Sequence, residues 1–137
     1  MRVLAIDYGD ARTGIAVSDK TGMIVGQTTV IHSRNAKKTA QEIALLVQQT
    51  GAERLVMGFP RNMDGTEGDR CAIVKEFMAE VKKAYPEVEV FFWDERLSTV
   101  AATRSLIEAD VSRRKRKKVI DKMAAVFILQ GFLDSKR

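Results

Sequence analysis

The sequence predicts an α/β fold in which helices flank a mixed five-stranded sheet of order 3-2-1-4-5. Two observations lead to this fold class. Residues 3–31 contain three short apolar segments separated by turn residues, and from residue 36 onward segments of helical period alternate with segments of strand period. A strand, helix, strand succession favours parallel pairing through a right-handed crossover. At 137 residues, the chain is expected to form a single domain over residues 1–137.

The first three strands are expected in the first quarter of the chain. Residues 3–8 predict a strand whose nearly continuous apolar character is typical of a central position, covered on both faces. The alternation of a strand places Asp7 on the same face as Val3 and Ala5. Residues 13–18 and 24–31 predict the next two strands. The tight turns between them favour an antiparallel meander.

Helices and strands alternate in the next part of the chain. Apolar residues recur at helical spacing over 36–47, and Gly51 is expected to end this helix. Residues 54–58 predict a short buried strand, followed by a turn-rich loop. A second helix is expected to start at Thr66 and to stop before Pro86. Its predicted core-facing line is Ile73, Phe77, Val81 and Tyr85.

The last part of the chain predicts one further strand and two helices. Residues 88–93 form the fifth strand, which leads into Asp94-Glu95-Arg96. Ser98 is expected to cap a third helix that ends near residue 109, and the last helix is expected over about 118–133. Asp121 heads an apolar line in this helix, so it is expected to face the core or a site edge and not solvent.

A run of six basic residues accounts for the basic character of the chain. The net charge is +5, and without these six charges it would be −1. Because a local basic patch suits a polyanion, the run is predicted to bind nucleic acid. The alternative is a solvated loop or a charged helix start. The run consists of Arg113, Arg114, Lys115, Arg116, Lys117 and Lys118.

Composition also bears on location and redox chemistry. No apolar run approaches the ~20 residues of a membrane span, and the N-terminus lacks the apolar segment of a signal peptide. We therefore expect a cytoplasmic protein with no membrane partner. Cys71 is the one cysteine, which excludes an internal disulfide and a zinc site built on cysteines.

Three acids occupy positions where a carboxylate is unusual. Asp7 ends the first strand, Glu95 follows the fifth, and Asp121 heads the last helix. An acid at the end of a buried strand costs free energy unless a partner neutralises it. In the order 3-2-1-4-5 the first and fifth strands end at one edge, where the last helix can bring Asp121. Three carboxylates suit Mg²⁺ or Mn²⁺, and such a site activates water for in-line attack on a phosphodiester.

Each of these acids also has a structural interpretation. Asp7 can cap the following turn, Glu95 can pair with Arg96, and Asp121 can interact with the dipole of its helix. Arg12 is predicted to bind a phosphate, with a role in the meander turn as the alternative. Arg96 is predicted to contact nucleic acid or to orient Glu95.

Four motifs, spread over almost the whole chain, occur in an order and spacing that are specific together. They are Asp7-Tyr8-Gly9 with Arg12-Thr13-Gly14, Gly58-Phe59-Pro60 with residues 62–68, Asp94-Glu95-Arg96-Leu97-Ser98-Thr99, and Asp121 followed by Ala124-Ala125. With these motifs the sequence resembles the YqgF family of Holliday-junction-resolvase-like proteins, also described as the pre-16S ribosomal RNA nuclease. The resemblance implies a ribonuclease H-like fold and metal-dependent hydrolysis at Asp7, Glu95 and Asp121. It also implies maturation of the 5′ end of small-subunit ribosomal RNA.

The expected protein is therefore a Mg²⁺- or Mn²⁺-dependent endonuclease for structured RNA, such as precursor rRNA, or for branched DNA. Association with a ribosomal subunit and a monomeric or weakly dimeric state are further expectations. A related resolvase pattern places two acids on the last helix. This chain has Ala124 and Ala125 one turn after Asp121, although three carboxylates can still hold a metal.

Three alternatives remain open at this point. The first is a Holliday-junction-type DNA resolvase. The second is a non-catalytic RNA-binding factor for ribosome assembly, for which the basic run alone would suffice. The third is an ATPase of the sugar-kinase and actin type, because residues 7–14 resemble the first phosphate loop of those enzymes. They close two such domains around the nucleotide, whereas 137 residues supply one.

Overall fold

The computed structural model describes the backbone of residues 1–97 and 113–136 and the side chains of residues 1–96 and 122–136. The strands are β1 (Val3–Asp7), β2 (Arg12–Ser18), β3 (Val25–His32), β4 (Arg54–Phe59) and β5 (Glu89–Asp94). The helices are α1 (Ala36–Thr50), α2 (Asp69–Ala84) and α4 (Arg113–Ser135), and a short 3-10 turn, η1 (Glu95–Leu97), follows β5. The helix predicted over 98–109 lies outside the described residues.

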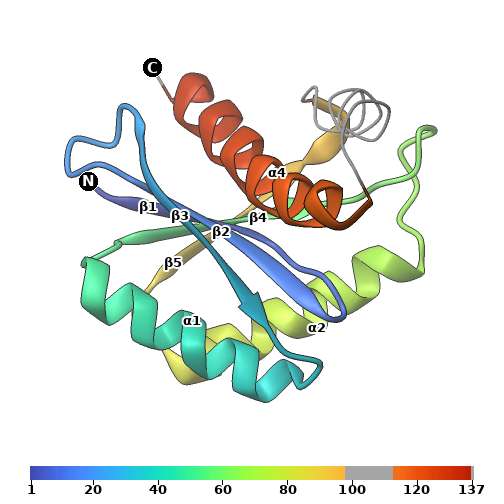
Figure 1. Ribbon diagram of the computed structural model, residues 1–137, viewed down its shortest axis with the longest axis horizontal. Coiled ribbons are helices and arrows are strands. Elements are labelled where there is room, and N and C mark those ends of the chain that lie inside the picture. The colour runs from blue at the N-terminus through green and yellow to red at the C-terminus, as the bar shows by residue number, and fades with distance from the viewer. Residues whose placement is uncertain (98–112, 137) are drawn as a thin grey trace.

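The strands form one sheet of order β3-β2-β1-β4-β5, which confirms the predicted class and strand order. Pairing is antiparallel between β1 and β2 and between β2 and β3, and parallel between β1 and β4 and between β4 and β5. Helices α1 and α2 cover one face, and α4 crosses the other (Figure 1). None of the described helices is long and apolar enough to cross a membrane.

Strand β1 lies in the middle of the sheet and is buried on both faces. Val3 and Ala5 belong to the core under α4, whereas Leu4 and Ile6 belong to the core under α1 and α2. Asp7 follows the same alternation and therefore lies on the α4 face.

The start and the buried face of α2 differ from the prediction. The helix begins at Asp69 after Gly68, because Thr66 donates its N–H (2.9 Å) and its hydroxyl (2.6 Å) to Asp64 Oδ1 and so belongs to the preceding loop. Ile73 is 40% exposed, so its predicted core position is wrong. A line of every fourth residue rotates about 40° per step around a helix of 3.6 residues per turn, and its ends therefore leave the buried stripe. The buried residues are Cys71, Val74, Phe77, Met78 and Val81.

Helix α4 begins at Arg113, five residues before the predicted start. Lys and Arg are good helix formers, so the basic run continues the helix in place of a loop. The face packed on the sheet consists of Ala124, Ala125, Ile128, Leu129, Phe132 and Leu133. Gly131 allows close approach to β5, because a Cβ at this position would lie 2.9 Å from Trp93 Cζ2.

Candidate active site

Asp7 lies at the end of β1 between two glycines of the neighbouring strands. Its partner on β2 is Gly14, and the pair Ile6–Met57 places Gly58 beside it on β4. Because Gly58 has no side chain, groups from other elements can approach the sheet beside Asp7. Asp7 itself is half-buried, whereas both glycines are buried.

The turn after Asp7 is fixed by a tight backbone approach and by an arginine from α2. A Cβ on Gly9 would lie 2.2 Å from the carbonyl oxygen of Arg12, so this turn requires glycine. Arg70 donates to the carbonyl oxygen of Tyr8 (2.5 Å) and to Asp10 Oδ1 (2.9 Å). The ring of Tyr8 stacks on Phe77, and burial raises the pKa of its hydroxyl. These contacts hold the turn that carries Asp7 against α2.

Glu95 extends from the end of β5 across β4 to the space above Gly58. Its Oε1 lies 2.8 Å from the position that a Cβ on Gly58 would take, and Ile128 Cδ1 of α4 lies 2.6 Å from the same point. Neighbouring strands are about 4.8 Å apart, so the Glu95 carboxylate is within roughly 8 Å of Asp7 Cβ. The structure thus brings two predicted acids, 88 positions apart in the chain, to one edge and one face of the sheet.

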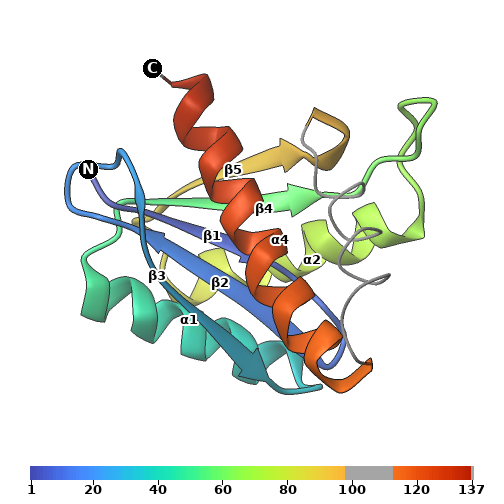
Figure 2. The same ribbon diagram turned by 45° about the horizontal axis from the view of Figure 1, so that its top comes forward.

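The third predicted acid, Asp121, belongs to α4, and its side chain lies outside the described residues. Its position precedes the buried Ala124 and Ala125 by one turn, on the same side of the helix. The N-terminal end of α4 lies on the side of the sheet where β1 and β4 end (Figure 2). Among the described side chains, no group of three Asp, Glu, His or Cys could hold a metal ion. A three-carboxylate site therefore depends on Asp121 and stays a prediction.

The residues at this edge fit a divalent cation such as Mg²⁺ or Mn²⁺. Asp7 and Glu95 offer hard oxygen ligands, which these ions prefer. The Glu95 carboxylate can occupy the space above Gly58 because glycine has no side chain there. Any larger residue at position 58 would fill that space. The local geometry is therefore that of an acidic site next to α4, whose Ile128 lies over Gly58.

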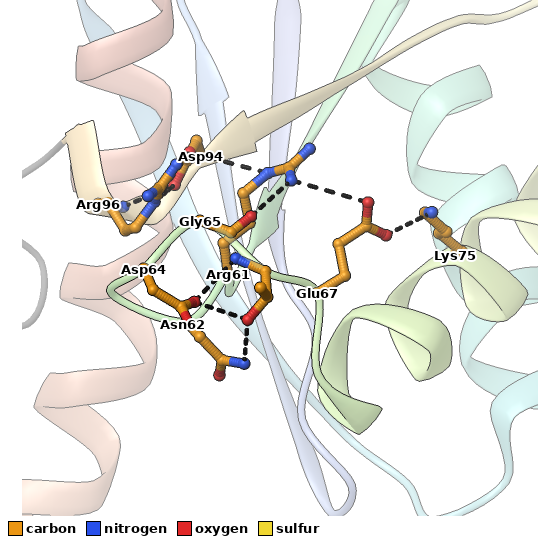
Figure 3. Close-up of polar contacts among 9 residues, drawn as sticks. Arg61, Asn62, Asp64, Gly65, Glu67, Lys75, Asp94 and Arg96 are labelled. Carbon is orange, nitrogen blue, oxygen red and sulfur yellow. Dashed lines mark hydrogen bonds and ion pairs between the residues drawn. The ribbon is translucent and has the colours of Figure 1, made fainter.

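The predicted nucleic-acid-binding residues are placed only in part. Arg12 begins β2, at the same end of the sheet as Asp7. Arg96 binds Asp94 through Nη2 (2.7 Å) and Nε (3.1 Å), so its described partner is the acid before Glu95 (Figure 3). The six residues of the basic run form the first turns of α4, and their side chains lie outside the described residues.

Asp94 positions the segment that carries Glu95. Its Oδ1 accepts the backbone N–H of Arg96 (3.0 Å), which starts η1 at the end of β5. Hydrogen bonds from the Arg96 side chain hold the pKa of Asp94 below its usual value. Asp94 therefore stays ionised and bonded to Arg96 at neutral pH.

A network around Arg61, which sequence reasoning missed, joins Asp94 to the loop of residues 60–68. Arg61 Nε lies 3.8 Å from Asp94 Oδ2, and Arg61 Nη1 donates to the carbonyl oxygen of Gly65 (3.1 Å) (Figure 3). Arg61 Nη1 also lies 3.7 Å from Glu67 Oε2, and Glu67 pairs with Lys75 of α2. No local pattern in the sequence points to this arginine, because its partners lie on other elements.

Comparison with known proteins identifies relatives over the full length of the chain. A family model described as RuvX, Holliday junction resolvase, matches residues 1–135. A protein of Carboxydothermus hydrogenoformans named "Putative pre-16S rRNA nuclease" is 47% identical over 136 residues, which cover 99% of this chain and 98% of the relative.

Two solved structures extend the comparison to the fold. RuvC of T. thermophilus in complex with a Holliday junction substrate has a TM-score of 0.62 at 13% identity and covers 99% of this chain and 95% of its own. The nuclease domain of the large terminase subunit of bacterial virus Sf6, solved with manganese, has a TM-score of 0.50 at 15% identity. The match covers 68% of this chain and 37% of the terminase chain. The fold shared with RuvC confirms the expected ribonuclease H-like class. On the family match and the 47% identity, this chain belongs to the RuvX family, also called YqgF.

Proposed function

We propose that this protein is a metal-dependent nuclease that hydrolyses phosphodiester bonds in the 5′-end processing of pre-16S ribosomal RNA. The observation that carries the proposal is the Glu95 carboxylate above Gly58, within roughly 8 Å of Asp7 Cβ. Two acids, one at the end of β1 and one just after β5, share one face, under the helix that contains Asp121. Membership of the RuvX family and the name of the C. hydrogenoformans relative support the same activity.

In the proposed site, Asp7, Glu95 and Asp121 hold a divalent cation, Mg²⁺ or Mn²⁺. When bound, such a cation supplies a Lewis acid for phosphodiester hydrolysis. Gly58 beside Asp7 leaves room for the Glu95 carboxylate, which this site needs. Arg12 and Arg96 bind neighbouring phosphates from the same edge of the sheet.

The basic run extends this nucleic-acid surface along α4. Residues 113–118 precede Asp121 on the same helix, and the rise of 1.5 Å per residue places the start of the run about 12 Å from Asp121 along the helix axis. RNA whose backbone lies along these turns reaches the acids at the end of β1.

The test is cleavage of a pre-16S RNA 5′ precursor by purified protein with Mg²⁺, with Mn²⁺ and without metal. We expect the wild type to cleave only with metal. Asp7→Asn, Glu95→Gln and Asp121→Asn should each lower the rate by about 100-fold or more, because each removes a proposed ligand. The matched control is Asp134→Asn, an exposed acid at the other end of α4, which should keep full activity. Metal-dependent cleavage by Asp7→Asn at the wild-type rate would refute the assignment.

A second candidate is a DNA resolvase, which the description of the family model favours. One turn after Asp121, where a resolvase pattern has a second acid, Ala124 and Ala125 are 1% and 0% exposed and pack against the sheet. We therefore expect the RNA precursor to be cleaved faster than a four-way DNA junction in the same assay. The opposite order of rates would favour the resolvase, and RNA binding without cleavage in any metal would favour a non-catalytic assembly factor.

The proposal extends to the cellular setting of the protein. Residues 1–137 would act as one nuclease domain in the cytoplasm, where precursor rRNA is available. Association with a ribosomal subunit would deliver that substrate, and a monomer or weak dimer would suffice for an endonucleolytic cut. Co-sedimentation with small-subunit precursors tests the association.

A further inference from the structure

The side chain of Met63 is 89% exposed, more than any other large apolar side chain in the part of the chain that the structure describes. A side chain in this position buries almost no apolar surface, so it contributes almost nothing to the hydrophobic stabilisation of the fold. Single exposed apolar residues are common on protein surfaces, so exposure alone does not indicate a site. The loop that carries Met63, residues 60–68, adds the observations that do.

This loop is held in one conformation by its own hydrogen bonds. The N–H of Asn62 donates to the carbonyl oxygen of Thr66, and the N–H of Gly65 donates to the carbonyl oxygen of Asn62. Both N···O distances are 2.9 Å. Asp64 Oδ1 accepts both the N–H and the hydroxyl of Thr66, and Asn62 Nδ2 donates to Thr66 Oγ1 (3.0 Å). Gly65 takes the left-handed conformation with φ of 91°, which closes the turn. The polar side chains on either side of Met63 thus bond within the loop.

Ion pairs fasten the loop at both of its ends to the rest of the fold. Arg61 reaches Asp94 at the end of β5, and Glu67 reaches Lys75 on α2 (Figure 3). Asp64 and Glu67 have pKa values below their usual range, through hydrogen bonds from Thr66 and Lys75 respectively. The two carboxylates therefore stay ionised and bonded at neutral pH. The loop is a fixed support for the apolar side chain that it presents.

The loop also lies beside the proposed catalytic acids. It follows Gly58 of β4 by two residues, and the Glu95 carboxylate lies above that glycine. Arg96, the residue after Glu95, has Nη1 3.3 Å from the position of a Cβ on Gly65. Met63 is five residues from Gly58, so the reach of the chain keeps the two Cα atoms within about 18 Å of each other.

We propose that Met63 is a wedge that inserts between nucleobases of bound RNA and unstacks them beside the cleaved phosphate. The inference rests on the proposed nuclease function and deepens it. Proteins that distort nucleic acid insert apolar side chains, methionine among them, between base steps. The thioether is polarizable and makes favourable contacts with aromatic rings. An apolar contact does not distinguish one base from another. Met63 should therefore select base steps that are accessible and not a particular base sequence.

The test uses a pre-16S RNA precursor that carries 2-aminopurine, an adenine analogue whose fluorescence rises when it unstacks, at adenines near the cleavage site. Binding is measured without divalent metal, so that the RNA stays intact. We expect wild-type protein to raise the fluorescence. Met63→Ala should bind up to about tenfold more weakly and give no rise at saturation, because it lacks the side chain that separates the bases. Met63→Leu, which keeps an apolar side chain of similar size, should restore the rise.

The matched control is Met23→Ala, which removes another exposed methionine (55%) from the turn between β2 and β3, beyond the far end of β2 from Arg12 and Gly14. This variant should behave as the wild type. A full fluorescence rise with Met63→Ala, or none with bound wild type, overturns the wedge and leaves the nuclease proposal intact. Lack of metal-dependent cleavage by the wild type in a parallel assay overturns the nuclease proposal, while the fluorescence still decides whether Met63 unstacks the RNA.

Discussion

At the scale of single residues, Gly58 determines whether Glu95 can reach the side of Asp7. A Cβ in Gly58→Ala would lie 2.8 Å from Glu95 Oε1 and 2.6 Å from Ile128 Cδ1, so both groups must move. We expect a loss of about 1–3 kcal/mol in the free energy of unfolding, as for other overpacked sites. Cleavage should fall by more than this loss of stability explains, because the carboxylate is displaced while the protein is still folded. Denaturant unfolding and cleavage rates measure the two effects.

The control for Gly58→Ala is a second glycine whose replacement lowers stability for another reason. Gly51 ends α1 with φ of 71° and would have nothing within 4 Å of a new Cβ. Gly51→Ala should therefore destabilise the fold by about 1 kcal/mol through its backbone conformation alone, and folded protein should cleave at the wild-type rate. Equal losses of activity in the two variants would show that Gly58 acts only through stability.

Residues of the candidate site differ in how far the sequence alone could reveal them. Asp7 and Glu95 could be predicted, because a carboxylate at the end of an apolar strand is a local and costly feature. Arg61 and Arg70 could not, since their guanidinium groups meet partners on other elements; Arg70 and Asp10, for example, are 60 positions apart. An arginine in a loop or on a helix surface has the same local pattern whether it bonds the site or solvent.

At the scale of elements, the packing of α4 on β5 depends on Gly131. Replacement of a helix-interior glycine by alanine gains about 1 kcal/mol in helix propensity. In Gly131→Ala the new Cβ would lie 2.9–3.2 Å from atoms of the Trp93 indole, a rigid ring, and overpacking of this kind costs about 1–3 kcal/mol. We expect the clash to prevail, with a net loss near 1 kcal/mol in denaturant unfolding.

A double-mutant cycle separates these two effects. In a Trp93→Leu background the ring is absent, so Gly131→Ala should become neutral or stabilising. The coupling free energy should be at least about 0.5 kcal/mol, as for residues in direct contact. Additive effects would show that the indole does not limit the approach of α4.

Elements were predictable where their hydrophobic period is strong. The five strands and α1 follow from alternation, turn residues and the glycine that ends α1. The start of α4 could not be predicted from the sequence, because a run of basic residues is compatible with both a loop and a helix. Tertiary contacts decide between the two. The predicted core line of α2 fails at Ile73, which is exposed, because residues spaced four apart drift around a helix of 3.6 residues per turn.

At the scale of the whole molecule, the basic run should dominate the electrostatics of RNA binding. Replacement of residues 113–118 by glutamine changes the net charge from +5 to −1, and α4 should persist because glutamine is a good helix former. On single-stranded RNA, the slope of log K against log salt changes by about 0.7 for each phosphate that the protein no longer neutralises. Binding titrations at several salt concentrations should therefore show a slope smaller by about four if all six residues bind phosphates.

The control for this charge change lies on the other side of the sheet. Lys37 and Lys38 are exposed on α1, on the face opposite α4 (Figure 1). Their joint replacement by glutamine lowers the net charge by two and should leave the salt slope unchanged. A comparable loss of slope would indicate that the total charge of the protein, and not the run on α4, governs binding.

The crossing of α4 over the ends of β1 and β4 has a consequence for the timing of activity during synthesis. In the proposed site, Asp7 emerges early from the ribosome, Glu95 much later, and Asp121 only after all five strands. A nascent chain that has already formed its sheet would still lack one ligand and the helix that covers the other two. In this proposal, RNA close to the site of translation would be protected from the nuclease until helix α4 has been made and has docked.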